Sequence, residues 1–214
     1  SNNITSAENI TISGTGISSN GAIRNTANDN TLSGLITLAA NSEIQIESGS
    51  VLTLNPTTGN AVTGTYNLTI DSIGTSFIND PIATSTGNLT KTGAGTLTLS
   101  GTNTYTGDTT ISDGTLKVTG TLADSTDVSV ASGATYKLEV SDTIGSISGQ
   151  GTVSVGDDFS FDAVVLTVDH SIAKTFSGNL IIPSAHGFVK LGSGTLTLTT
   201  ANTDADGDIT VTGG

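Results

Sequence analysis

The chain has 214 residues, of which 19 are acidic and six are basic, and it contains no Cys, Met or Trp. Its formal charge of −13 argues against nucleic acid or an anionic membrane surface as a partner, because both require clustered cations on the protein. The absence of cysteine excludes a disulfide framework, and the lack of an apolar run of about 18 residues predicts no membrane insertion by this segment. Aromatic residues make up only 4% of the chain, so we expect a thin core of Leu, Ile, Val and Ala.

Short runs of alternating apolar and polar residues follow one another along the whole chain. Alternation with period two indicates a strand with one buried face, and no stretch shows the 3.6-residue periodicity of an amphipathic helix. We therefore expect an all-β protein with essentially no α-helix. In chain order, the clearest predicted strands lie at 9–13, 35–38, 43–47, 51–54, 67–70, 96–99, 115–118, 136–140, 152–155 and 165–168.

The spacing of equivalent strands favours a solenoid over a sandwich. Turns of 15 to 22 residues, each with two or three short strands, are typical of a right-handed parallel β-helix. About ten such turns, stacked at ~4.8 Å, would form a rod roughly 50 Å long. A β-sandwich would also alternate, but it does not explain a long repeat. The pairs expected to stack are Leu97/Leu99, Leu116/Val118, Leu138/Val140 and Val153/Val155 on one face, and Ile111, Val128/Val130 and Ile144/Ile147 on a second.

A longer repeat is superimposed on the strands. The stretch 91–100, Lys-Thr-Gly-Ala-Gly-Thr-Leu-Thr-Leu-Ser, returns 99 residues later at 190–199 as Lys-Leu-Gly-Ser-Gly-Thr-Leu-Thr-Leu-Thr. A glycine pair precedes the strand in both copies, and glycine suits the tight corners between stacked strands. No linker interrupts the pattern, so we expect residues 1–214 to form a single continuous solenoid segment.

The block from Leu89 to Leu116 resembles the autotransporter-associated β-strand repeat, also called the passenger-associated transport repeat. The resemblance rests on three motifs, which are Lys-x-Gly-x-Gly-Thr-Leu-x-Leu at 91–99, Asn-Thr-Tyr-x-Gly at 103–107 and Ile-x-x-Gly-Thr-Leu at 111–116.

A second copy, at 188–214, departs from the pattern, with Asp204 where the equivalent of Tyr105 belongs. The resemblance implies a β-helical passenger exported to the surface of a Gram-negative bacterium, commonly an adhesin or stalk. It transfers no catalytic residue.

Three aspartates near the end of the sequence form a candidate calcium site. Asp204, Asp206 and Asp208 alternate around Gly207, and alternating carboxylates suit a hard cation. The pattern lacks the distal Glu of a helix-flanked calcium loop, which favours an acidic turn between strands instead. We expect calcium binding to be millimolar or weaker, and no other cofactor.

Four aspartates, Asp157, Asp158, Asp162 and Asp169, could supply the paired carboxylates of a β-helical polysaccharide hydrolase. Such an enzyme needs aromatic platforms for sugar rings and basic residues for sugar acids, but Trp is absent and Arg24 is the only arginine. We therefore expect no enzyme and no catalytic residue, and keep a carbohydrate-active β-helix enzyme as a minor alternative.

The remaining candidates are isolated side chains. His170 and His186 have no Cys and no second His at ligand spacing, so neither is expected to bind a metal or belong to a catalytic triad. Tyr66, Tyr105 and Tyr136 are expected to cover the edges of turns, with Tyr105 or the Thr-rich faces available for ligand contact.

Four Asn-x-Thr triplets in which x is not proline begin at Asn3, Asn9, Asn67 and Asn88. In a bacterial protein we interpret them as a turn asparagine next to a strand threonine.

The leading expectation is a structural and adhesive segment of an extracellular bacterial surface protein, a stiff stalk or passenger involved in adhesion or biofilm. The alternative is the protomer of an extracellular filament, because neither end of the sequence shows an element that would cap an open solenoid edge. The expected partners are flanking repeats or further copies stacked end to end, together with host or matrix glycans.

Overall fold

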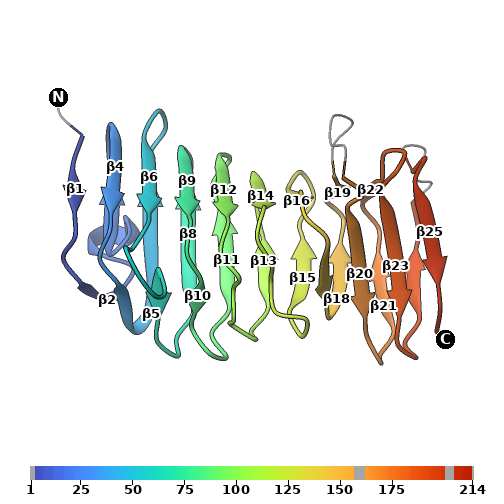
Figure 1. The fold of residues 1–214 in the computed structure, drawn as a ribbon. Coiled ribbons are helices and arrows are strands. Elements are labelled where there is room, and N and C mark those ends of the chain that lie inside the picture. Colours follow the sequence, from blue (N-terminus) through green and yellow to red (C-terminus); the bar gives the residue numbers. More distant parts are fainter. Residues whose placement is uncertain (1–2, 157–161, 201–204, 214) are drawn as a thin grey trace.

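The chain forms an elongated parallel β-solenoid, with the N-terminal and C-terminal turns at opposite ends (Figure 1). The computed structural model describes residues 3–156, 162–200 and 205–213. Within these ranges every strand pair is parallel, and the only helical element is a short 3-10 turn, η1, at Ile17–Ser19. The all-β, parallel β-helix prediction is confirmed. No helix in the described part of the chain is long and apolar enough to cross a membrane.

The first face is a nine-stranded sheet with one strand from each turn, so the solenoid has about nine turns, close to the ten predicted. In sheet order the strands are β1 (Thr5–Ser6), β4 (Asp29–Leu32), β6 (Val51–Leu54), β9 (Thr75–Ile78), β12 (Thr96–Leu99), β14 (Thr115–Val118), β16 (Thr135–Leu138), β19 (Thr152–Val155) and β22 (Asn179–Ile181). In β6, β14 and β19 buried aliphatic residues alternate with half-buried outward residues, which is why the period-two runs of the sequence are found here.

The second face branches at its longest strand, β5 (Ile36–Ile46), which combines the two separate strands predicted at 35–38 and 43–47. The first part of β5 pairs with β2 (Ile10–Gly14) and β7 (Val62–Thr63), and its last part pairs with β3 (Ile23–Asn25) and β8 (Leu68–Ser72). The sheet continues from β7 to β10 (Ile82–Ala83), and from β8 to β11 (Leu89–Thr92), β13 (Thr109–Ile111), β15 (Asp127–Val130), β18 (Ser146–Gly149), β21 (Lys174–Phe176) and β24 (Leu196–Leu198).

A third sheet occupies the C-terminal half. It contains β17 (Asp142–Ile144), β20 (Val165–Asp169), β23 (Gly187–Leu191) and β25 (Asp208–Val211).

The core lies between these sheets and consists of stacked rows of Leu, Ile and Val. One row runs through Leu97, Leu116, Tyr136 and Val153, and the neighbouring row through Leu99, Val118, Leu138 and Val155.

The predicted stacking of Leu138/Val140 on Leu116/Val118 is therefore wrong by two residues, because Tyr136 takes the place of Leu138, while Val140 is 37% exposed. A shift of two residues preserves the alternation of buried and exposed positions, so the sequence pattern alone could not reveal it.

The predicted stacking of Ile144 is also wrong. Ile144 lies in β17 and pairs with Val168, whereas Ile147 stacks on Val128 and Gly149 takes the place opposite Val130.

Candidate functional site

The lysine of the repeated Lys-x-Gly motif is buried in the core. Lys91 is an inward residue of β11 and stacks between Ile70 and Ile111. Its ammonium group reaches backbone carbonyl oxygens at the corner that follows the strand. Lys91 Nζ donates to the carbonyl oxygens of Thr92 at 2.7 Å and Gly93 at 2.5 Å, and lies 3.3 Å from that of Asp113 and 3.4 Å from that of Ser72.

This corner depends on a glycine as well as on the lysine. Gly93 has a φ of 72°, and a Cβ there would lie only 2.8 Å from the carbonyl oxygen of Ser72 in the preceding turn. Burial lowers the pKa of Lys91 to about 8, although the carboxylates of Asp113 and Asp71 favour the charged form. The motif thus combines a left-handed corner with a buried cation that binds its carbonyl groups.

The second copy of the motif repeats this arrangement. Lys190 is buried in β23, and its ammonium donates to the carbonyl oxygens of Leu191 and Gly192. Gly192 also has a φ of 72°, and a Cβ there would lie 2.4 Å from the carbonyl oxygen of His170. Two equivalent sites in one chain indicate that the lysine of the repeat stabilises the corner of the solenoid.

In the Asn-Thr-Tyr part of the first copy, Asn103 and Tyr105 are also buried. The amide group of Asn103 donates to the carbonyl oxygens of Gly101 at 3.0 Å and Thr121 at 2.9 Å, while its Oδ1 accepts the N–H of Ile82 at 3.0 Å. The Tyr105 hydroxyl lies 2.7 Å from Thr109 Oγ1.

The prediction that the tyrosines cover the edges of turns is wrong for Tyr105 and Tyr136, which are completely buried, because large side chains fill the interior at these two turns. Tyr66 is exposed.

A buried carboxylate lies where the third sheet begins. Asp142 Oδ2 accepts the N–H of Leu122 at 2.9 Å, and its Oδ1 accepts the N–H of Thr143 at 3.0 Å. Burial, assisted by the charge of Asp124, raises the pKa of Asp142 to about 6 despite these hydrogen bonds. The Tyr136 hydroxyl is buried with no hydrogen-bond partner among the described residues, and burial raises its pKa.

A polar hollow of about 300 Å³ lies on the surface above Asp142. Two carboxylates face it, and neighbouring hydroxyl groups surround them. Its lining consists of Asp124, Ser141, Asp142, Thr143, Val165 and Thr167.

The predicted acidic sites are only partly described. Asp204, Asp157 and Asp158 lie outside the described residues, while Asp206 and Asp208 are exposed, the latter at the start of β25. Within the described ranges, no three His, Cys, Asp or Glu side chains are grouped so that they could hold a metal ion. Weak calcium binding therefore stays a prediction.

Both histidines are buried and contact backbone groups. His170 Nδ1 lies 2.6 Å from the carbonyl oxygen of Ile172, and His186 Nδ1 accepts the N–H of Val164 at 3.0 Å. The His186 ring also lies against Gly156, where a Cβ would come within 2.5 Å of it.

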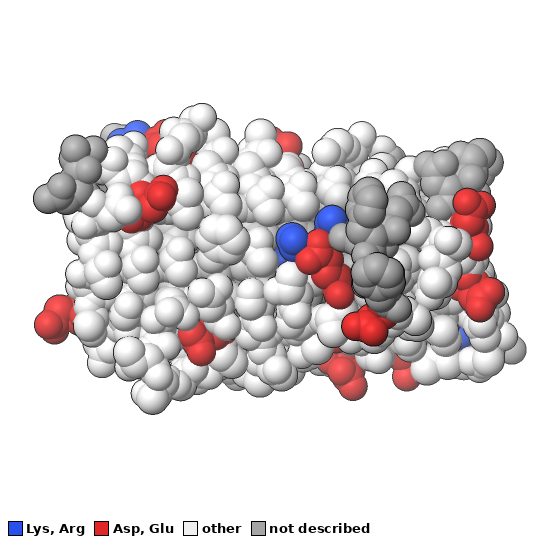
Figure 2. Space-filling view, turned by 45° about the horizontal axis from the view of Figure 1, so that its top comes forward, with Lys and Arg blue, Asp and Glu red and all other residues white. Residues whose placement is uncertain are grey.

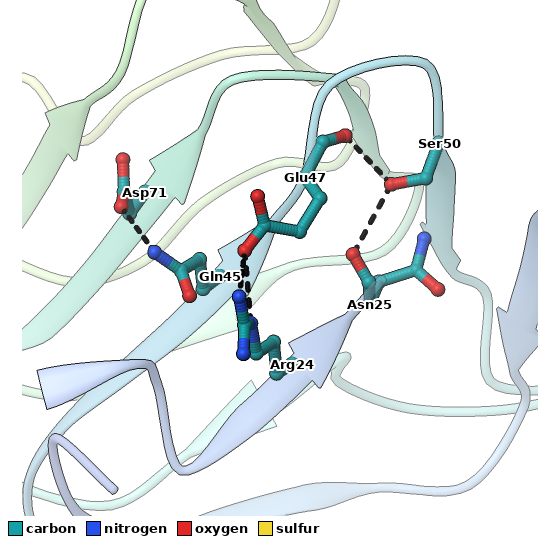
Figure 3. A network of polar contacts seen from close by, with 6 residues as sticks. All are labelled: Arg24, Asn25, Gln45, Glu47, Ser50 and Asp71. Carbon is teal, nitrogen blue, oxygen red and sulfur yellow. Dashed lines mark hydrogen bonds and ion pairs between the residues drawn. The ribbon is translucent and has the colours of Figure 1, made fainter. Parts of the chain in front are cut away.

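Each of the six basic side chains is engaged with an acceptor. Lys91 and Lys190 bind backbone carbonyl groups, and Arg24 pairs with Glu47 at 2.6 Å within a polar network that also joins Gln45 to Asp71 (Figure 3). Figure 2 shows a face that is mostly uncharged, with its central basic groups next to acidic ones. The other ion pairs are Lys117–Glu139 at 2.8 Å, Lys137–Glu139 at 3.2 Å and Lys174–Asp127 at 2.7 Å.

The stacked parallel turns and their repeated lysine corners define a β-solenoid repeat protein. Residues 89–118 and 188–214 match the family model of the passenger-associated-transport-repeat, as the motifs predict. Neither a curated protein nor a solved structure matches the chain. The fold and these two matched segments fit a β-helix repeat protein of the autotransporter-passenger type.

Proposed function

We propose that this passenger-type segment is a stiff spacer of an exported bacterial surface protein and serves adhesion or biofilm formation. The observation that carries this proposal is the nine-stranded sheet, in which each turn contributes one strand and stacks in register on the next. Bending such a rod would break several backbone hydrogen bonds at once, each with a net value of about 0.5–1.5 kcal/mol. The buried lysine corners add further contacts between turns.

The chemistry of the surface supports a neutral, hydroxyl-rich partner. Every Lys and Arg side chain is engaged within the protein, which disfavours nucleic acid and other polyanions. Outward rows of Thr and Ser offer hydroxyl groups at regular spacing, as in the row Thr75, Thr96, Thr115, Thr135 and Thr152. Host or matrix glycans fit this surface, and we propose that they are bound without being cleaved.

A bead-retention assay tests the adhesive role. Beads coated with the purified chain would be passed over surfaces carrying glycans or extracellular matrix, with beads coated with a Leu97→Asp variant as the control. Leu97 is fully buried, so a charge there should unfold the turns around it. Equal retention of both kinds of bead would contradict adhesion. Release of products from pectin, alginate or chondroitin-type polymers would contradict the non-enzymatic role.

A second candidate function, the filament protomer, is favoured by the turn that contains β25. Ile209 and Val211 stack on Phe188 and Lys190, yet they are 47% and 67% exposed. Beside them lies a mostly apolar hollow of about 240 Å³. We propose that another parallel turn covers these apolar side chains, supplied by neighbouring repeats of the same polypeptide or by another copy. A heterologous contact between copies would produce an open fibre.

Electron microscopy over a range of concentrations tests this alternative. Filaments of the chain that disappear in an Ile209→Asp variant would support end-to-end stacking, and a monodisperse monomer at high concentration would count against it.

A further inference from the structure

The four Asn-x-Thr triplets share one hydrogen-bond geometry. In each triplet the side-chain carbonyl of the asparagine accepts a backbone N–H from the following turn of the solenoid. The pairs are Asn3 with Asp29 at 3.4 Å, Asn9 with Leu35 at 2.9 Å, Asn67 with Asn88 at 2.9 Å and Asn88 with Asp108 at 2.9 Å.

Asn41 shows that the asparagine, and not the triplet, is responsible. It is followed by Ser42 and Glu43, so it is not part of an Asn-x-Thr sequence, yet its Oδ1 accepts the N–H of Asn67 at 3.0 Å. Asn41, Asn67 and Asn88 therefore form a continuous ladder along one corner of the rod.

The asparagine side chain replaces one backbone acceptor of the parallel ladder. In a parallel sheet, a residue accepts the N–H that follows its partner and donates to the C=O that precedes it. The carbonyl oxygen of Asn88 accepts the N–H of Leu68 at 2.9 Å, as the ladder requires, but its N–H donates to the side chain of Asn67. At the next turn, Asp108 accepts from Leu89 and donates to Asn88 in the same way.

We propose that these asparagines act as surrogate backbone acceptors that fix the register with which each turn stacks on the next. The proposal deepens the spacer function but rests only on the fold. A slip of one residue would turn core residues such as Leu68 and Leu89 outward. A slip of two residues keeps them inward but separates the side-chain carbonyl from its N–H. The asparagine therefore distinguishes the native register from a slip of two residues, which the alternation of apolar and polar residues does not.

The asparagine ladder ends at Asp108. The equivalent positions in the following turns are Asp127 and Ser146, which have no carboxamide. At Asn67 and Asn88 the triplet thus marks the start of a strand, with asparagine for register, a buried leucine for the core and Thr for the outer face.

Hydrogen exchange of a single amide tests the proposal. In an Asn67→Ala variant, the Asn88 amide should exchange about tenfold faster than in the wild type, because its acceptor is lost. Asn67→Asp should restore protection, since the bond uses only an acceptor oxygen. Asn60→Ala is the matched control, because the Asn60 carboxamide has no hydrogen bond to any residue that the structure describes.

A second pair, Asn41→Ala read at the Asn67 amide, repeats the measurement at the neighbouring turn. Unchanged exchange at both amides, or a failure of Asn67→Asp to restore protection, would overturn the proposal. Because the readout is local, it is independent of whether the rod binds glycans.

Discussion

The ammonium group of Lys91 lies 2.5 Å from the carbonyl oxygen of Gly93, the residue that turns the chain through a left-handed corner. The strand and its corner are thereby linked within three residues, and the Ser72 and Asp113 carbonyls extend the contact to both neighbouring turns. The same lysine would be an ordinary surface residue if it pointed outward. Because Lys91 points inward, its ammonium group can bind the carbonyl groups of the corner.

Replacing Lys91 with Met should destabilise the solenoid by about 1–3 kcal/mol, because the stem still fills the core while the carbonyl groups at the corner lose their donor. Denaturant unfolding measures this difference. Lys117→Met is the matched control, since Lys117 forms only a partly exposed ion pair with Glu139 and should change stability by about 1 kcal/mol or less. Equal effects of both substitutions would show that Lys91 does not stabilise its corner.

Replacing Gly93 with Ala should cost more than replacing Gly133 with Ala. Both glycines have positive φ, so each alanine would suffer about 1–2 kcal/mol of backbone strain. Only the Gly93 Cβ would also meet backbone atoms of Ser72 at 2.8 Å, whereas nothing lies within 4 Å of a Cβ at Gly133. Thermal unfolding of the two variants compares them directly, and similar melting temperatures would argue against the close approach at Gly93.

Lys91 also predicts a dependence of stability on alkaline pH. Burial lowers its pKa from 10.5 to about 8, so between these values the unfolded chain binds more protons than the folded chain. The contribution of this group to the free energy of unfolding should therefore rise as pH increases from 8 to 10.5. The wild-type protein should show this rise relative to Lys91→Met, and parallel pH profiles for the two proteins would contradict it.

The fold class could be predicted from the sequence because period-two alternation reports directly on one-sided burial. The strand β11 was harder to recognise, since Lys91 occupies an inward position and interrupts the apolar pattern of Leu89-Thr90-Lys91-Thr92. Very short strands such as β7 and β10, with two residues each, carry no periodicity at all.

The site residues were harder still to predict. Lys91 and Asn103 are polar residues whose partners are backbone carbonyl groups of other turns, and no sequence pattern identifies a backbone partner. The sequence did offer one indication of the lysine site, which is that the Lys-x-Gly motif returns after 99 residues. A lysine that occupies the same position in two copies of a repeat indicates a shared structural role.

The last prediction concerns Asp142, which should stabilise the protein in mild acid. Its pKa rises from 3.8 to about 6 on folding, so the folded chain holds a proton more tightly than the unfolded chain in this window. The contribution is fully present below pH 3.8 and is lost as pH rises through 6. The neighbouring titratable groups are Asp124, Tyr105 and Tyr136, and the two tyrosines keep their protons throughout because burial raises the pKa of both.

Asp142→Asn isolates this effect, because it removes the titration while keeping one side-chain acceptor for the two N–H groups. The free energy of unfolding of the variant should change less between pH 7 and pH 4.5 than that of the wild type. Asp127 and Glu139, whose pKa values are lowered by Lys174 and by Lys117 and Lys137, act in the opposite direction in both proteins and cancel in the comparison. Identical pH slopes for wild type and variant would show that Asp142 is not the group that responds to acid.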